Sequence, residues 1–552
     1  MESDPDLMRV NIVFNPHAGA HGVCPLTVEA YRVRPGHTAV CPYKLVWRET
    51  MLRAVLYLNC RVAILLIVTL ITSRAFAEVP PTTQPAGASI AFTSRDPVIV
   101  RCRKMMDAGD FAKAIDLLDH EQTSDARAAD EMRDVIARTR SAYTTDAQRM
   151  LGKIRNSISD VTAEDLERWR KAGELDYRKI DGKVEYFNRE PANLFRFCEE
   201  AKRRRTPAAD EQTGWKLEEH LARVIAAAKD GGPEVVPIRH RINYSLTVPT
   251  NAPGFKAGAL VRVWLPFPQE YRQQRDVKLI GTSPAYTLLA PSASGEVADH
   301  GAAQRTLYFE QRVTDLAKPL TFAETFEYTC SAYYPQLDDA KAQPLPTNYS
   351  DGDIGERPPH ILFTPTVKEI VADVVGDETN PLIKARKIFH FVSKNIAYCA
   401  EEEYGTIPSL SVKALSKRRG DCGVQGMTFI TLCRAAGIPA RWQTGWETKR
   451  VGSDFHDWCE FYVAPWGWLP CDPSYGLQKS EDPSIREFYF GHLDSYRLIV
   501  NRDYGRELIP PKQSLRSEPL DFQRGEVEID GKNVYFTHWD FDMNMEWLSD
   551  GP

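Results

Sequence analysis

A cysteine, a histidine and an aspartate follow one another within some fifty residues, each in a distinct local setting. Glycines lie on both sides of Cys422 in Gly420-Asp421-Cys422-Gly423. His456 is the second residue of the run Phe455-His456-Asp457-Trp458, and Asp472 precedes a proline. Cysteine acyl-transfer chemistry needs a nucleophile, a base that takes its proton and a group that orients the base. The three residue types, in this order, indicate chemistry of that kind.

Cys422 must be presented by a sharp turn that leads into a helix. From Val424 apolar residues recur at three- and four-residue steps, and Gly437 and Pro439 then mark the end of the helix. At the amino end of a helix, unpaired N–H groups and the helix dipole favour a thiolate and lower the thiol pKa from about 8.5. The same N–H groups could hold an oxyanion. Without a nearby base, the alternative is an inert buried thiol.

A hairpin is expected to bring the other two residues together. Residues 441–446 and 456–463 are predicted to be strands, and Trp466-Gly467-Trp468 can turn the chain back into 469–472. His456 and Asp472 lie at similar distances from this turn, so Asp472 can orient the imidazole. The alternatives are a surface histidine and an ordinary turn before a proline.

Together these segments resemble the core of the transglutaminase-like superfamily, in the form that exported bacterial proteins carry. The motifs are those quoted above, with Cys433-Arg434-Ala435-Ala436-Gly437-Ile438-Pro439-Ala440-Arg441, His456-x-Trp458-x-Glu460-x-Tyr462 and Gly467-Trp468-x-x-x-Asp472-Pro473. The resemblance implies a papain-like α+β catalytic core over residues 358–480.

The resemblance also assigns roles to residues. It implies Cys422 as nucleophile, His456 as general base and then acid, and Asp472 as the orienting group. An aromatic residue upstream of the cysteine often completes the oxyanion hole in this family, which makes Tyr398 the candidate here. Trp458 and Glu460 match motif positions and are expected to support the site. The resemblance implies no cofactor and no metal for the chemistry, and we see no EF-hand loop.

The rest of the chain is expected to form accessory regions, which makes the protein a multidomain α+β protein. Residues 97–230 have helical patterns, and Gly231-Gly232-Pro233 marks a boundary. Residues 235–340 alternate between polar and apolar side chains, which predicts an antiparallel β-sandwich-like domain. Residues 481–552 are predicted to be a β-rich extension of the catalytic core.

The first part of the chain has the pattern of an export signal. In residues 51–77, arginines precede an apolar run that is shorter than the roughly 20 residues needed to span a bilayer, and Ala75-Phe76-Ala77 offers a cleavage site. A buried or membrane-anchoring helix is the alternative. Residues 1–50 are then a doubtful upstream extension and 78–96 a linker. The mature protein is expected to be periplasmic or extracellular, without a stable membrane anchor.

Composition narrows the function further. The chain has a net charge of −6, which gives no indication of the basic face that nucleic-acid binding needs. The cysteines form no C-x-x-C pair, so the sequence predicts neither a zinc site nor a dithiol. We expect an enzyme that acts on amide bonds of proteins or peptides, as a protease or amidase. Alternatives are a crosslinking transglutaminase with an amine acceptor, a cell-wall amidase and a non-catalytic binding scaffold. The oligomeric state is left open.

Overall fold

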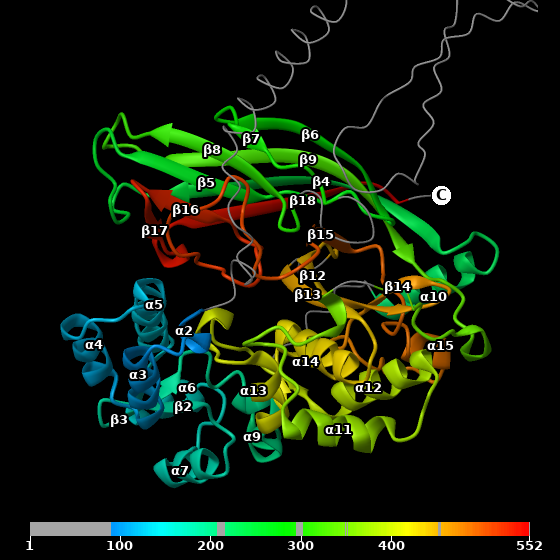
Figure 1. The fold of residues 1–552 in the computed structure, drawn as a ribbon, viewed down its shortest axis with the longest axis horizontal. Helices are drawn as coiled ribbons and strands as arrows, with labels where there is room; N and C mark the ends of the chain where they lie inside the picture. Colours follow the sequence, from blue (N-terminus) through cyan, green and yellow to red (C-terminus); the bar gives the residue numbers. More distant parts are fainter. Residues whose placement is uncertain are drawn as a thin grey trace, which may run out of the picture. The chain divides into compact units, whose positions relative to one another are not determined.

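The computed structural model describes residues 90–206, 216–293, 302–347, 349, 352–450 and 454–550 (Figure 1). They belong to one compact unit, Thr82–Pro552. The predictions for residues 1–50 and 51–77, and most of the predicted linker, lie outside the described residues. Across the described ranges, none of the helices combines the length and the apolar character needed to cross a membrane.

The region that was expected to be helical is mainly helical but also contains a small antiparallel sheet. Its order is β1-β3-β2, and β3 includes the segment Lys183–Phe187. The helix at Ala163–Lys171 begins as the sequence suggests, with Thr162 and Asp165 forming a capping box. The elements are α2 (Ile90–Thr93), α3 (Pro97–Ala108), α4 (Phe111–His120), α5 (Ala126–Ala142), β1 (Tyr143–Thr145), α6 (Ala147–Arg155), α7 (Ala163–Lys171), β2 (Tyr177–Ile180), β3 (Lys183–Phe187), α8 (Leu194–Phe197), α9 (Glu199–Arg204) and α10 (Leu217–Ala228).

Two antiparallel sheets follow, with the orders β17-β16-β5-β8-β7 and β18-β4-β9-β6. Their strands are β4 (Glu234–Val248), β5 (Leu260–Pro266), β6 (Gln274–Ser283), β7 (Leu288–Leu289), β8 (Thr306–Arg312), β9 (Leu320–Tyr333), β16 (Glu526–Ile529), β17 (Lys532–Val534) and β18 (Asp540–Asp550). The alternating pattern of β4 buries every second side chain, as expected for a strand with one face in a core.

The C-terminal strands differ from the sequence expectation. β16 pairs with β5 and β18 pairs with β4, so both complete the sheets of the sandwich region rather than extend the catalytic core. Within residues 481–552, β15 (Arg497–Asn501) is the strand that joins the catalytic sheet, through β12 (Ala440–Glu447). Alternation of side chains predicts that a strand forms, but it does not identify the neighbour with which the strand pairs.

The predicted catalytic core combines helices with a four-stranded antiparallel sheet of order β14-β13-β12-β15. Asn380 caps α12 and Pro381 is its first residue, as the sequence predicts. The remaining elements are α11 (Pro365–Val375), α12 (Pro381–Asn395), β10 (Ala397–Tyr398), α13 (Leu410–Lys417), β11 (Arg419–Gly420), α14 (Cys422–Ala435), β13 (Asp454–Val463), β14 (Gly467–Cys471) and α15 (Pro483–Arg486), with short 3₁₀ turns η1 (Asp339–Lys341), η2 (Gly352–Ile354), η3 (Tyr404–Thr406) and η4 (Phe536–His538).

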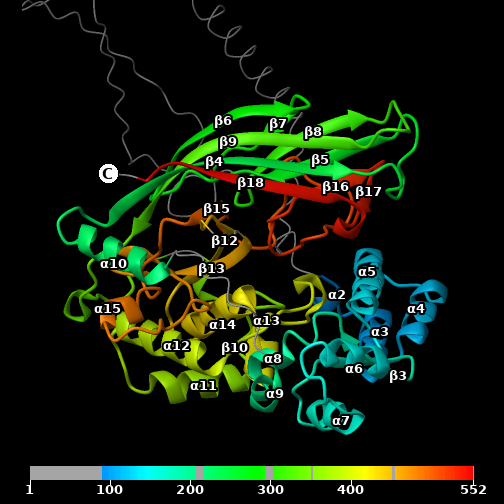
Figure 2. The same ribbon diagram turned by 180° about the vertical axis from the view of Figure 1, so that it is seen from behind.

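The catalytic sheet lies between its own helices and the two larger sheets, as both views show (Figure 2). On one side α14 packs on β13 and β12, and every residue of α14 up to Arg434 is buried. On the other side Trp446, Leu498 and Val500 belong to the apolar core of the sandwich. Both faces of the sheet are therefore packed against other elements, and this packing holds the strands that carry the candidate residues in position.

Candidate active site

Cys422 is the first residue of α14, as the sequence predicts. Asp421 caps the helix by accepting a hydrogen bond from the N–H of Val424 at 3.2 Å. Packing explains why position 423 is a glycine, because a Cβ there would lie 2.3 Å from the hydroxyl of Tyr404. That hydroxyl accepts a hydrogen bond from the Gly423 N–H at 3.1 Å. The glycine after the cysteine thus makes room for a tyrosine that the sequence analysis did not single out.

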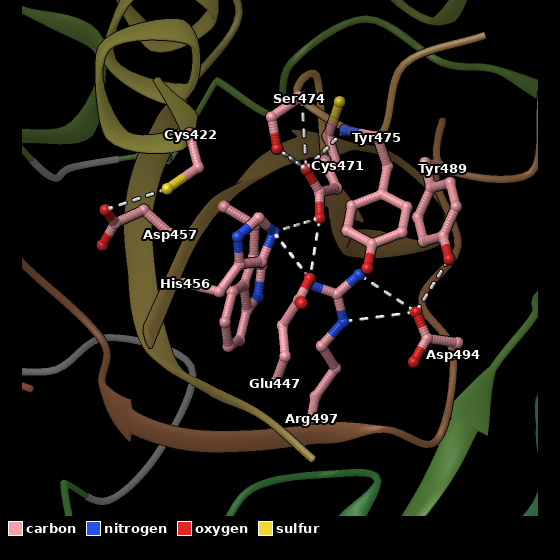
Figure 3. A network of polar contacts seen from close by, with 12 residues as sticks. Cys422, Glu447, His456, Asp457, Cys471, Ser474, Tyr475, Tyr489, Asp494 and Arg497 are labelled. Atoms are coloured by element: carbon pink, nitrogen blue, oxygen red, sulfur yellow. Dashed lines mark hydrogen bonds and ion pairs between the residues drawn. The ribbon is translucent and has the colours of Figure 1, made fainter. Parts of the chain in front are cut away.

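The thiol of Cys422 contacts a carboxylate. It donates to Oδ2 of Asp457 at 3.6 Å (Figure 3). The same Oδ2 lies 3.1 Å from the Tyr404 hydroxyl, and Oδ1 accepts from the side-chain amide of Gln523 at 3.0 Å. Asp457 is 2% exposed. This aspartate therefore occupies the polar position next to the thiol.

The surroundings of the thiol act against its ionisation. Burial, together with the charges of Asp457 and Asp421, raises the pKa of Cys422 well above its ordinary value. Burial likewise raises the pKa of Asp457, and it raises that of Asp421 to about 8. The helix start was predicted to lower the thiol pKa. The structure gives the opposite direction, because desolvation and neighbouring carboxylates outweigh the helix dipole.

His456 and Asp472 meet as the hairpin geometry predicts. Their Nε2 and Oδ2 atoms are 2.8 Å apart, and both residues are buried. Glu447 lies 3.6 Å from the same ring nitrogen. Burial lowers the pKa of His456, but the charges of Asp472 and Glu447 raise it above its ordinary value overall.

Arg497 completes this cluster from β15. Its guanidinium lies 3.0 Å from Asp472 and 3.0 Å from Asp494, and its side chain is 1% exposed. Burial acts to raise the pKa of Asp472, but the charges of His456 and Arg497 hold it below its usual range. The aspartate therefore stays ionised between the guanidinium of Arg497 and the imidazole of His456; Figure 3 shows Arg497 beside Asp494 in the same cluster.

The structure does not join the nucleophile candidate to the base candidate directly. In the described part of the chain, no hydrogen bond links Cys422 to His456; the thiol turns to Asp457 instead. His456 and Asp457 are consecutive in β13, where successive side chains point to opposite faces. The structure thus brings together His456 with Asp472, and Cys422 with the neighbour of His456.

The three supporting residues have different environments. Tyr398 is 41% exposed on β10, where it pairs with Gly420 and lines the same cavity as Cys422. Trp458 is fully buried; its ring stacks on that of His456 with centroids 5.9 Å apart. Glu460 is also fully buried and forms ion pairs with Arg441, at 2.8 Å, and with Arg272. Glu460 therefore holds the catalytic sheet to residues that precede it, rather than facing the thiol.

A cavity of about 200 Å³ opens beside Cys422. Charged and polar side chains dominate its wall: Arg189, Tyr398, Glu401, Glu402, Glu403, Tyr404, Asp421, Cys422, Asp454, Phe455, Asp457, Asp521, Gln523 and Arg524. Over the described ranges, no three His, Cys, Asp or Glu side chains are placed to hold a metal ion.

Sequence reasoning missed several residues of this site. Asp457 is adjacent to His456 and could have been found by asking which side chain faces the other way. Arg497 is a single cation at the head of the apolar run Arg497–Val500, which is itself a signal of a buried ion pair. No local pattern marks Tyr404 or Gln523, because their roles depend on segments brought together by the fold.

Comparison with known proteins identifies the class. Residues 368–473 match the family model described as the transglutaminase-like superfamily. This segment, which carries Cys422, His456 and Asp472, is a transglutaminase-like core.

Two curated relatives share parts of the chain. An uncharacterized protein of Haemophilus influenzae is 25% identical over 215 residues, covering 32% of this chain and 57% of the relative. YebA of Bacillus subtilis, also uncharacterized, is 26% identical over 185 residues, covering 30% of this chain and 22% of its own length. The chain therefore spans less than two thirds of either relative.

Solved structures give more distant similarities. A Cytophaga hutchinsonii protein named as a candidate cysteine protease has a TM-score of 0.38 and 14% identity, covering 57% of this chain and 91% of its own. The periplasmic domain of TgpA from Pseudomonas aeruginosa has a TM-score of 0.23 and 16% identity, covering 45% of this chain and 90% of its own.

Proposed function

We propose that the protein is an exported cysteine-dependent enzyme that cleaves amide bonds in proteins or peptides. The observation that carries the proposal is the transglutaminase-like core, in which Cys422 starts a helix and His456 is hydrogen-bonded to Asp472. A nucleophile at a helix start and a base held by a carboxylate are the parts that acyl transfer requires.

The proposed reaction requires the Cys422 thiol to leave Asp457 and to come within hydrogen-bond distance of His456, which needs a rearrangement of the site and not a turn of one side chain. His456 takes the thiol proton, and the sulfur attacks the amide carbonyl carbon. The carbon–nitrogen bond then breaks, and the amine leaves with the proton from His456. Water, deprotonated by His456, attacks the thioester and releases the carboxylic acid and the free thiol. Asp472 orients the ring and stabilises its charged form throughout.

The oxyanion of each tetrahedral intermediate needs donors close to the sulfur. The backbone N–H of Cys422 at the start of α14 is the candidate donor, since the N–H groups of Gly423 and Val424 already bond to Tyr404 and Asp421, and Tyr398 lines the same cavity. Trp458 supports the imidazole by stacking, and Glu460 fixes the strand that carries it. No cofactor or metal is needed for these steps.

An amine in place of water would make the enzyme a crosslinking transglutaminase, with the same thioester. A binding scaffold is the second alternative, since Cys422 and His456 are not hydrogen-bonded in the resting structure. Residues 51–77 carry the proposed export signal, and we propose a periplasmic or extracellular location with a protein or peptide as substrate. Nucleic acid is not a proposed partner.

The function is tested by incubating the full chain with a peptide library, with and without a primary amine, and analysing products by mass spectrometry. We expect new carboxylates, and a loss of turnover of roughly 10³-fold or more in Cys422→Ala with the melting temperature nearly unchanged. Cys433→Ala, in the same helix but away from the cavity, is the matched control. Equal turnover in Cys422→Ala and the native protein would refute the proposal.

A further inference from the structure

We infer that Glu447 is a second positioning carboxylate for the imidazole of His456, beside Asp472, and that it stabilises the charged form of this ring during the reaction. The inference deepens the proposed function, and it rests on that function for the statement that His456 is the base. Its structural part rests on a closed group of four buried side chains, Asp472, His456, Glu447 and Arg497, which we call the charge ring. Figure 3 shows Glu447 between His456 and Arg497.

Each strand of the catalytic sheet supplies one member of the charge ring. Asp472 directly follows β14, and His456 lies on β13. Glu447 is the last residue of β12, and Arg497 on β15 is its cross-strand partner. Glu447 also lies two residues beyond Gly445, which pairs with His456. Because residues two apart on a strand share a face, the register brings these side chains together on one side of the sheet.

Positive and negative groups alternate around the charge ring. Nε2 of His456 lies 2.8 Å from Asp472 and 3.6 Å from Glu447. Arg497 lies 3.7 Å from Glu447 and 3.0 Å from Asp472, which closes the ring. With a neutral imidazole, two carboxylates face a single guanidinium. An imidazolium balances the charges within the ring, and balance matters because a buried charge without a partner is costly.

Glu447 also has a partner outside the charge ring. Lys449 pairs with it at 2.6 Å, but the lysine side chain is 22% exposed, so water weakens this attraction. Burial acts to raise the pKa of Glu447, but the charges of its cationic neighbours hold it below the ordinary value. The carboxylate therefore stays ionised. The alternative is a purely structural role, in which Glu447 serves only to pair with Lys449.

The charge ring bears on the step in which the thiol proton moves. Because Asp472 is ionised, Nε2 of His456 carries the proton of their hydrogen bond, which leaves Nδ1 to take the thiol proton. The S–H bond breaks, the sulfur becomes a thiolate and the imidazole becomes an imidazolium. Burial lowers the pKa of His456, but the two carboxylates of the ring raise it above the ordinary value. This rise offsets part of the raised pKa of the Cys422 thiol.

Other titratable groups surround the imidazole and contribute to its pH dependence. Tyr475 packs edge-on against the ring of His456 and accepts a hydrogen bond from Lys449. Asp457 follows His456 on β13 and contacts the Cys422 thiol. Behind Arg497, Asp494 lies 3.0 Å from the guanidinium. A test of Glu447 must therefore leave these groups in place.

The charge state of His456 can be measured without turnover. In the full chain labelled with isotopes at histidine, NMR follows the ring signal that disappears in His456→Gln across a pH series. The titration midpoint should fall in Glu447→Gln, because a negative neighbour of the imidazolium is removed. Glu487→Gln is the matched control, since this carboxylate lies 3.0 Å from His390, and it should leave the midpoint of His456 unchanged.

A double variant separates direct contact from net charge. Glu447→Gln with Lys449→Met removes one negative and one positive group, so the net charge of the chain stays as in the native protein. The midpoint of His456 should still lie below the native value, because Glu447 is the group that faces the imidazole. A native midpoint in the double variant, or an unchanged midpoint in Glu447→Gln, would overturn the inference.

Turnover of the peptide substrates gives the second readout. Glu447→Gln should lower kcat by about tenfold and leave KM nearly unchanged, because Glu447 acts through the base and does not line the cavity beside Cys422. Glu447→Asp retains the charge and should restore part of kcat. A native kcat in Glu447→Gln would contradict the inference. If the native protein cleaves no peptide, the proposed function fails, while the midpoints still decide whether Glu447 stabilises the charge of His456.

Discussion

The two sides of strand β13 differ in how their charges are balanced. On the His456 side every carboxylate has a cation: Asp472 faces His456 and Arg497, Asp494 faces Arg497, and Glu447 faces Lys449 at 2.6 Å. On the Cys422 side Asp457 and Asp421 are hydrogen-bonded but face no cation. The difference teaches that the proposed base, His456, is held in place by its charged neighbours, whereas the proposed nucleophile, Cys422, is held in surroundings that oppose its ionisation.

The largest effect is expected from removing the cation of the balanced side. Arg497→Met leaves Asp494 buried without its ion-pair partner and Asp472 with His456 alone, which should lower the free energy of unfolding by about 3–5 kcal/mol. Arg524→Met, on the thiol side, removes a guanidinium that is 22% exposed, pairs with Glu518 and lies over the rings of Phe455 and Phe536. Denaturant unfolding should show a clearly smaller loss of unfolding free energy for Arg524→Met than for Arg497→Met. Equal losses would contradict the difference between the two sides of β13.

A steric change tests how tightly the thiol side is packed. In Gly423→Ala the new Cβ would lie 2.3 Å from the Tyr404 hydroxyl and 2.6 Å from its ring. Because the ring must move, we expect a loss of about 1–3 kcal/mol in the free energy of unfolding. Gly426→Ala, one turn along the same helix, meets nothing nearer than 3.8 Å and should be neutral or stabilising. A similar loss in both variants would show that helix packing in general is responsible.

A charge change tests the thiol side chemically. Asp457→Asn keeps an acceptor for the thiol but removes its negative neighbour, so the pKa of Cys422 should fall. Each unit of fall gives up to about tenfold more thiolate at a pH below the pKa. Alkylation of Cys422 by iodoacetamide across a pH series should show the shift. Asp494→Asn, on the balanced side, should leave the pH profile unchanged, and an unchanged profile in Asp457→Asn would contradict the expected influence of this carboxylate.

The remaining effect concerns the pH dependence of stability. Burial raises the pKa of Asp421 to about 8, above the unfolded value near 4. The folded state therefore binds more protons than the unfolded state between these values, and stability falls as pH rises through this window. Asp421→Asn keeps the helix cap and should flatten that fall. Unfolding free energies measured between pH 5 and pH 9 would reveal it; parallel curves for both proteins would exclude Asp421 as the titrating group.

Much of the framework could be predicted from local patterns. The start of α12 at Asn380-Pro381, the position of Cys422 at the head of α14 and the contact of His456 with Asp472 depend on caps, glycines and a short hairpin. These features involve residues that are near in sequence, so one window of sequence contains the information.

The remainder could not be predicted because it depends on distant segments. Asp457 is placed to accept the hydrogen bond of the thiol because Tyr404 and Gln523, from two other segments, donate hydrogen bonds to its carboxylate. Arg497 reaches Asp472 only because β15 pairs with β12. The direction of the thiol pKa shift follows from these long-range contacts, which outweigh the local helix dipole.

The pairing of β18 with β4 has a consequence for how the chain is made. β4 ends at Val248, whereas its partner β18 begins at Asp540. During synthesis the edge of β4 must stay open while the whole catalytic region emerges from the ribosome, and an open edge invites pairing with other chains. Contacts this distant in sequence also slow folding. Newly made protein should therefore depend on chaperones that shield strand edges until the final strand arrives.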